Sequence, residues 1–74
     1  MPRLPRVYGD FNGLDRGYVP LDTHGSTEDL EAFGDAVQDG LSIVVFDDSC
    51  EADAVLERLG DEWSARIVSP IRDI

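Results

Sequence analysis

The sequence predicts a small, mainly β domain of the α+β class. Short stretches of alternating or β-branched apolar residues recur along the chain, and clusters of turn residues separate them. A single clear helix start is present, and 74 residues leave room for one apolar core. We therefore expect residues 1–5 to form a short N-terminal lead and residues 6–74 to form one small domain.

Two strands are expected before the helix. Residues 6–11 alternate between apolar and polar side chains, which is typical of a half-buried strand. Asn12-Gly13 then predicts a turn. Residues 18–21 predict a second strand, at the edge of the sheet, because Pro20 has no N–H to give to a neighbouring strand.

One short helix is expected between the second and third strands. Ser26–Asp29 places hydroxyl residues before acidic ones, which is typical of a capped helix start. Leu30 and Phe33 share one face, and Gly34 suits the left-handed position after the last turn, so the helix would have about seven residues. A longer helix that continues to Gly40 is the alternative.

Three further strands follow the helix. Residues 41–46 are rich in β-branched side chains and predict a central strand. Residues 52–58 and 63–68 predict a hairpin, joined by the glycine-containing connection 59–62. Residues 69–74 interrupt the ladder at their proline, and we expect them to close with a single helical turn.

Five short strands and one short helix have to cover an apolar sheet face, which favours a sheet that curls onto itself. The spacing of Val37, Gly40 and Ile43 is also used by SH3-like barrels to enter a strand from a tight turn. The sequence therefore predicts a small five-stranded SH3-like or strongly bent antiparallel barrel.

The order of several short motifs resembles a family of short, uncharacterised bacterial proteins. The resemblance covers about Pro5 to Arg72 and implies a glycine turn before the apolar strand and a tryptophan early in the last strand. It implies no catalytic or binding residue. Residues 52–57 and 68–70 depart from the family pattern, so the register of the last two strands stays open. The motifs are Arg6-Val7-Tyr8, Asp10-Phe11-Asn12, Thr27-Glu28-Asp29-Leu30, Asp39-Gly40-Leu41, Asp47-Asp48 and Trp63-Ser64-Ala65-Arg66-Ile67.

The net charge of the chain disfavours some classes of binding partner. Sixteen acidic residues against six arginines give a formal charge of −10, which disfavours direct binding to nucleic acid or anionic membranes. The acidity reflects either the composition of the host or a surface made for a basic protein. No apolar run approaches a membrane span, and the first residues lack a secretory signal, so we expect a cytoplasmic protein.

The densest acidic group consists of Asp47, Asp48, Glu51 and Asp53, after the central strand. It is a candidate surface for a basic partner. A fold that depends on weak Ca²⁺ binding is a further hypothesis, but the spacing matches no established calcium loop. We expect no cofactor and no specific metal site.

Catalytic residues are not indicated. His24 and Cys50 are each the single residue of their type, so the chain cannot form an internal disulfide or a zinc site of several Cys and His ligands. A Cys–His nucleophile would need an orienting group and a cleft, and a cysteine beside acids keeps a high pKa. We expect the protein not to be an enzyme.

Three aromatic residues are candidates for recognition. Tyr8 and Tyr18 occupy polar-facing positions of the first two strands and would form a shallow binding surface. Trp63 alternates with Ala65 and Ile67, which favours a place in the core over a binding hot spot.

These observations favour a non-enzymatic β-barrel interaction module or assembly subunit with a protein partner. The alternative is an acidic decoy that imitates nucleic acid and occupies the site of a basic protein. The small core also favours self-association, and a homodimer that pairs edge strands is expected on this ground.

Overall fold

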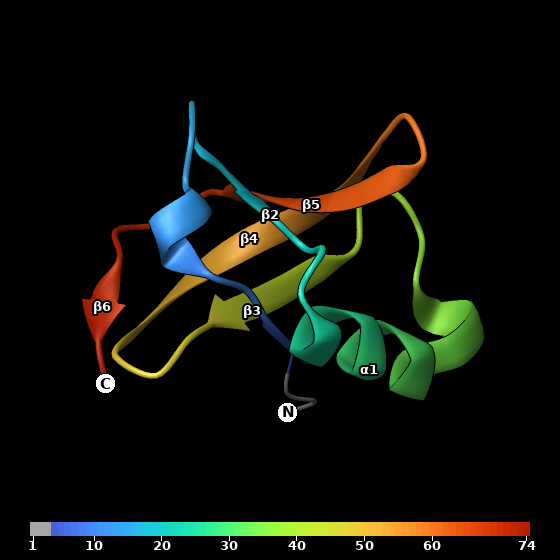
Figure 1. Cartoon of the computed structure of the whole chain (residues 1–74), viewed down its shortest axis with the longest axis horizontal. Helices are drawn as coiled ribbons and strands as arrows, with labels where there is room; N and C mark the ends of the chain where they lie inside the picture. Colours follow the sequence, from blue (N-terminus) through green and yellow to red (C-terminus); the bar gives the residue numbers. More distant parts are fainter. Residues whose placement is uncertain (1–3) are drawn as a thin grey trace.

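The computed structural model describes residues 4–74 (Figure 1). Six strands, one α-helix and two 3₁₀ turns follow one another along these residues. In chain order they are β1 (Arg6–Tyr8), η1 (Phe11–Gly13), β2 (Tyr18–Pro20), α1 (His24–Phe33), η2 (Gly34–Ala36), β3 (Ser42–Phe46), β4 (Cys50–Leu59), β5 (Glu62–Ile67) and β6 (Arg72–Asp73).

All six strands belong to one mixed sheet. Its order is β1-β3-β4-β5-β2, and β6 pairs with the start of β4. The mainly β, α+β prediction is confirmed, but the count of five strands is wrong by one. The antiparallel prediction is wrong for β1 and β3, which are parallel. Their connection holds β2 and α1, and a long crossover that contains a helix returns the chain in the same direction.

The sheet is not closed into the expected barrel, because its order ends at β1 and β2. It is nevertheless strongly bent. A Cβ placed on Gly9, directly after β1, would lie 2.9 Å from Val19 of β2 and 2.7 Å from Val45 of β3. The two end strands therefore face each other across the core without hydrogen bonding.

Other groups cover the sheet edges that barrel closure would have removed. At β1, the Tyr8 N–H donates to the Asp29 carboxylate at 2.8 Å, and the Ser26 hydroxyl donates to the Tyr8 carbonyl. At β2, the backbone of Tyr18 pairs with Asp15, and Pro20 offers no N–H. Helix α1 and a tight turn thus protect the edges from pairing with another chain.

Helix α1 begins earlier than the sequence indicates. Thr23 is its N-cap, and the Thr23 hydroxyl accepts a hydrogen bond from the Ser26 N–H at 3.0 Å. Ser26 is fully buried inside the first turn, where its own hydroxyl serves β1 rather than the cap. The predicted end is confirmed, since Gly34 takes a φ of 56° after Phe33 and the chain continues as η2.

The β4–β5 hairpin is confirmed with a shorter connection. Leu59 pairs with Glu62, so that Gly60 and Asp61 form a two-residue turn, with Gly60 at a φ of 68°. Strand β4 begins at Cys50, two residues before the predicted start, because β6 supplies its partner there.

The predicted C-terminal helical turn is wrong. After β5 the chain bulges at Ser69 and Pro70 and then returns to β4 as β6. The Val68 N–H donates to the Asp53 carbonyl, and the Asp53 N–H donates to the Ser69 hydroxyl at 2.8 Å. These two bonds hold the bulge against β4 and direct the last residues into a strand.

The core lies on the concave face of the sheet, with α1 against its β1 edge (Figure 1). Trp63, Ala65 and Ile67 share this face, as their alternation predicts; Ala65 is fully buried and the other two are half-buried. The opposite face, called the outer face below, carries the charged side chains of β1, β4, β5 and β6. The buried apolar residues are Val7, Val19, Leu21, Ile43, Val45, Ala52, Ala54, Leu56 and Ala65.

Candidate functional site

Asp47, the first residue of the predicted acidic site, organises the β3–β4 turn. Its Oδ1 accepts hydrogen bonds from the N–H groups of Ser49 and Cys50 at 2.8 and 2.9 Å, and its Oδ2 accepts one from the Phe11 N–H at 3.4 Å. Donation from the Ser49 N–H, helped by that of Cys50, lowers the pKa of Asp47 against the opposing effect of burial. Asp47 is thus fixed as a turn-forming carboxylate.

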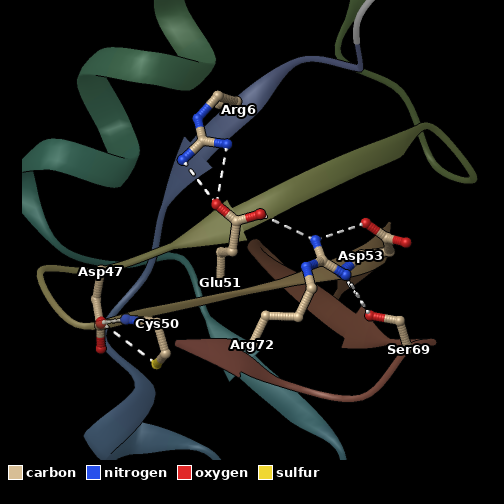
Figure 2. A network of polar contacts seen from close by, with 7 residues as sticks. All are labelled: Arg6, Asp47, Cys50, Glu51, Asp53, Ser69 and Arg72. Atoms are coloured by element: carbon tan, nitrogen blue, oxygen red, sulfur yellow. Dashed lines mark hydrogen bonds and ion pairs between the residues drawn. The ribbon is translucent and has the colours of Figure 1, made fainter. Parts of the chain in front are cut away.

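Glu51 and Asp53, on the outer face of β4, are paired with arginines of the same chain (Figure 2). Glu51 receives Arg6 from β1 at 3.2 Å and Arg72 from β6 at 3.1 Å. Arg72 also contacts Asp53 at 3.1 Å. Hydrogen bonding to Arg72, and then to Arg6, lowers the pKa of Glu51 despite its partial desolvation. This network ties both ends of the chain to β4 and leaves little free negative charge.

Asp48 completes the predicted acidic group and is exposed at the β3–β4 turn. Within residues 4–74 its side chain has no hydrogen-bond or ion-pair partner. No group of three or more His, Cys, Asp or Glu side chains in that part of the chain could hold a metal ion. The geometry therefore gives no support to a fold that depends on a cation.

Tyr8 and Tyr18 are not brought together. They lie on β1 and β2, at opposite ends of the sheet order. Tyr8 packs edge-on against Phe46, with ring centroids 5.8 Å apart, and Tyr18 donates its hydroxyl to Glu57 at 3.0 Å. Desolvation raises the pKa of Tyr8, and the hydrogen bond to Glu57 raises that of Tyr18. The two rings thus have different partners, Phe46 of β3 for Tyr8 and Glu57 of β4 for Tyr18.

His24 and Cys50 are also separate. His24 lies at the start of α1 beside Glu28, with 2.8 Å between Nε2 and the carboxylate. The Cys50 thiol lies 3.4 Å from Asp47, and partial burial followed by this hydrogen bond raises its pKa. Each group is engaged by a different carboxylate, so this pair has no nucleophile–base geometry.

A groove lies between α1 and the β4–β5 turn. Its volume is about 530 Å³. Positions 27, 30, 31 and 34 of the helix side face into it, at the spacing of one helical stripe. Apolar side chains form the floor, and carboxylates form the rim. The floor consists of Leu21, Leu30, Val37 and Trp63, and the rim consists of Asp22, Glu31, Asp61 and Glu62.

The rim differs in charge from the outer face. All four rim carboxylates are exposed, and within residues 4–74 none of them forms an ion pair with an arginine. The nearby cation is Arg58, whose guanidinium lies over the Trp63 ring at 5.7 Å and donates to the Gly60 carbonyl. The groove therefore combines an apolar floor with four carboxylates that form no ion pair within residues 4–74, and Arg58 lies beside its Trp63 wall.

Sequence reasoning missed this groove because its walls come from three separate segments: the β2–α1 connection, α1 with the residues that follow it, and the β4–β5 turn. Two signals pointed towards it. Trp63 is the single tryptophan of the chain, and the helical stripe continues past Leu30 to Gly34. Neither signal alone says which loops meet.

Comparison with family models, with curated proteins and with solved structures found no match. None of the helices formed by residues 4–74 has the length and apolar character needed to span a membrane. The resemblance noted from the sequence motifs stays a prediction, and the functional reasoning below depends on the geometry of this chain.

Proposed function

We propose that this protein is a non-enzymatic interaction module that binds a basic region of a protein partner on its helix side. The observation that carries the proposal is the uneven pairing of its charges. Arg6, Arg66 and Arg72 all lie on the outer face, where they neutralise carboxylates of β4. The acids around the groove have no arginine partner among residues 4–74.

The outer face is a poor site for a basic partner. Glu57 already holds Arg66 and the Tyr18 hydroxyl, and Glu51 already holds two arginines. A basic segment would have to displace these intramolecular contacts before it gained its own. Around the groove, an incoming Arg or Lys would gain charge-assisted contacts without that cost.

Two features support a non-enzymatic role. The candidate nucleophile Cys50 has a raised pKa and is hydrogen bonded to Asp47, so its thiolate is disfavoured at neutral pH. The groove itself presents carboxylates and apolar side chains, and its lining residues include no histidine, cysteine or arginine. An assembly subunit that uses the same surface is included in this proposal.

The acidic decoy is the competing proposal, and net charge is what supports it. A decoy needs a continuous row of free carboxylates, and pairing of Glu51, Asp53 and Glu57 with arginines removes such a row from the outer face. The two proposals differ in whether nucleic acid and this chain compete for one site on the partner.

Three further expectations remain part of the proposal. A cytoplasmic location agrees with the single unpaired Cys50. SH3-like character is supported by the curvature that brings Gly9 against Val19. A homodimer would have to use a surface other than the two covered sheet edges, and sedimentation velocity over a concentration series tests for it.

The test of the proposed function is capture of a partner by the immobilised full chain from nuclease-treated extract of the native host. A variant in which two acids of the groove rim are reversed, Asp22→Arg/Asp61→Arg, is compared with a control variant that makes the same change in net charge away from the groove, Asp48→Arg/Asp73→Arg. We expect a basic protein that the unmodified chain and the control variant retain and the groove-rim variant loses. Its affinity, measured by calorimetry, should fall as salt rises.

Three results would count against this function. If the groove-rim variant captures the same protein as the unmodified chain, the proposed binding surface is wrong. Competition between the chain and duplex DNA for the purified partner favours the decoy. Substrate turnover that a single substitution at Cys50, His24 or Asp47 abolishes would make the protein an enzyme.

A further inference from the structure

We infer that the groove between α1 and the β4–β5 turn docks a short protein segment in which one large apolar side chain is flanked by Arg or Lys. This inference rests on the proposed function and deepens it, because it names the site and the chemical pattern of the partner. Three observations carry it: the incomplete packing of the groove floor, the rim carboxylates without an ion-pair partner among residues 4–74, and the position of Glu31.

The floor of the groove is the side of the core at which the apolar side chains are not fully buried. Leu30, Val37 and Trp63 pack against the buried cluster and line the groove, yet each is only partly buried. Leu21, beneath them, is 4 % exposed and connects the groove to the core itself. At about 530 Å³ the groove falls within the range of roughly 300–1,000 Å³ that is typical of ligand sites. An apolar side chain from a partner would complete this packing.

The rim selects the residues beside that anchor. Asp22, Glu31, Asp61 and Glu62 come from three segments and surround the floor, so cationic side chains on either side of the anchor meet a carboxylate. Charge complementarity therefore points to Arg or Lys. It also disfavours a second copy of this chain docked groove to groove, because two acidic rims would repel each other.

Glu31 is hard to explain by folding alone. It lies in the last turn of α1, where the helix dipole disfavours a carboxylate. This effect opposes the helix. A cationic residue of a partner seated beside Glu31 would offset it.

The chain provides its own reporter for the test. Trp63 is its single tryptophan and lines the groove, so its fluorescence can be followed without labels. The probes are short synthetic peptides that lack tryptophan and carry two arginines on each side of a central position. The central residue is Leu, Met, Phe, Tyr or Gly. All probes have the same charge, so a difference in affinity between them reports the contribution of the central apolar side chain and not that of the flanking arginines.

We expect saturable binding at low salt for the peptides with a large apolar centre. Binding of the Gly peptide should be weaker by about tenfold to a hundredfold, the range that burial of one large apolar side chain implies. Affinities that do not depend on the central residue, or a failure of every peptide to saturate, would overturn the inference.

A matched pair of variants assigns the binding to the groove. Glu31→Arg/Glu62→Arg reverses two rim charges, and Asp48→Arg/Asp73→Arg makes the same change in net charge at the other end of the molecule, near β6 (Figure 1). All four residues are exposed, so both variants should fold, as circular dichroism and thermal melts will verify. We expect about tenfold weaker binding of the Phe peptide for the rim variant and a much smaller change for its control.

The outcomes separate this inference from the broader function. Equal weakening by both variants would remove the groove as the site and leave a protein that binds basic partners through its overall field. No weakening by either variant, at low salt, would contradict both the groove and the basic partner. Selective loss in the rim variant supports both.

Discussion

The outer face of the sheet and the groove beside α1 use carboxylates in opposite ways. On the outer face, Glu51, Asp53 and Glu57 are held by arginines that join β1, β5 and β6 to β4. Around the groove, four exposed carboxylates surround an apolar floor without such partners in the described chain. The comparison teaches that a net charge of −10 says nothing about where negative charge is available to a partner.

The largest expected effect on stability compares a fully buried core residue with a residue that lines the groove. Leu56 is fully buried, and Leu56→Ala should lower the free energy of unfolding by about 2–5 kcal/mol, because it leaves a cavity. Leu30 is only partly buried and lines the groove, and Leu30→Ala should cost about 1–2 kcal/mol. Urea unfolding of both variants measures the difference. Equal losses of unfolding free energy for the two variants would mean that Leu30 is as buried in solution as Leu56, and that the groove is therefore not open.

Ser26 should have the next largest effect. Its hydroxyl is fully buried and donates to the Tyr8 carbonyl, so Ser26→Ala leaves an acceptor at the edge of β1 without its partner. A loss of about 1–3 kcal/mol is expected in chemical denaturation. Ser42→Ala, on the exposed start of β3, is the control and should be nearly neutral. A neutral Ser26 variant would show that the β1 edge does not depend on α1.

The arginine network should make stability depend on pH. The folded-state pKa of Glu51 lies below its ordinary value of 4.5, so its contribution is complete above that pH and is lost as the pH falls through the folded-state value. The gap between the native chain and Glu51→Gln should therefore be largest near neutral pH and close under acid conditions. Asp48→Asn, measured in the same series, is expected to show no comparable gap. A gap that persists at low pH would contradict the pairing.

The smallest expected effect has the opposite sign. Glu31→Gln removes a carboxylate from the last turn of α1, where the helix dipole disfavours it, so we expect a gain of about 0.3–0.5 kcal/mol at low salt. Thermal melts at low and high salt test this, since screening should abolish the gain. A loss of stability would show that Glu31 has a structural role on the groove side.

Local signals in the sequence predicted the elements whose form depends on a few neighbouring residues. Gly34 ends α1, residues 42–46 form a central strand, and Ala65 faces the core between Trp63 and Ile67, each from spacing or backbone preference alone. Alternation fixes which face a residue occupies, and it carries this information over short distances.

The parts that were missed depend on contacts between distant segments. Ser26 has the sequence pattern of a cap, but burial against Tyr8 moves the cap to Thr23. The parallel pairing of β1 with β3 and the return of β6 to β4 require knowledge of which strands meet. The acidic group after β3 was visible as charge, but its neutralisation by Arg6 and Arg72 joins residues far apart in the chain.

Helix α1 is a wall shared by two surfaces. One face supplies Ser26 and Asp29 to the backbone of Tyr8, and the adjacent face lines the groove through Thr27 and Leu30. A partner bound in the groove would hold α1 in place and would therefore slow the local opening that exposes β1. Deuterium uptake at the Tyr8 amide would thereby report whether the groove on the adjacent helix face is occupied, and an empty groove would leave β1 more open to aggregation.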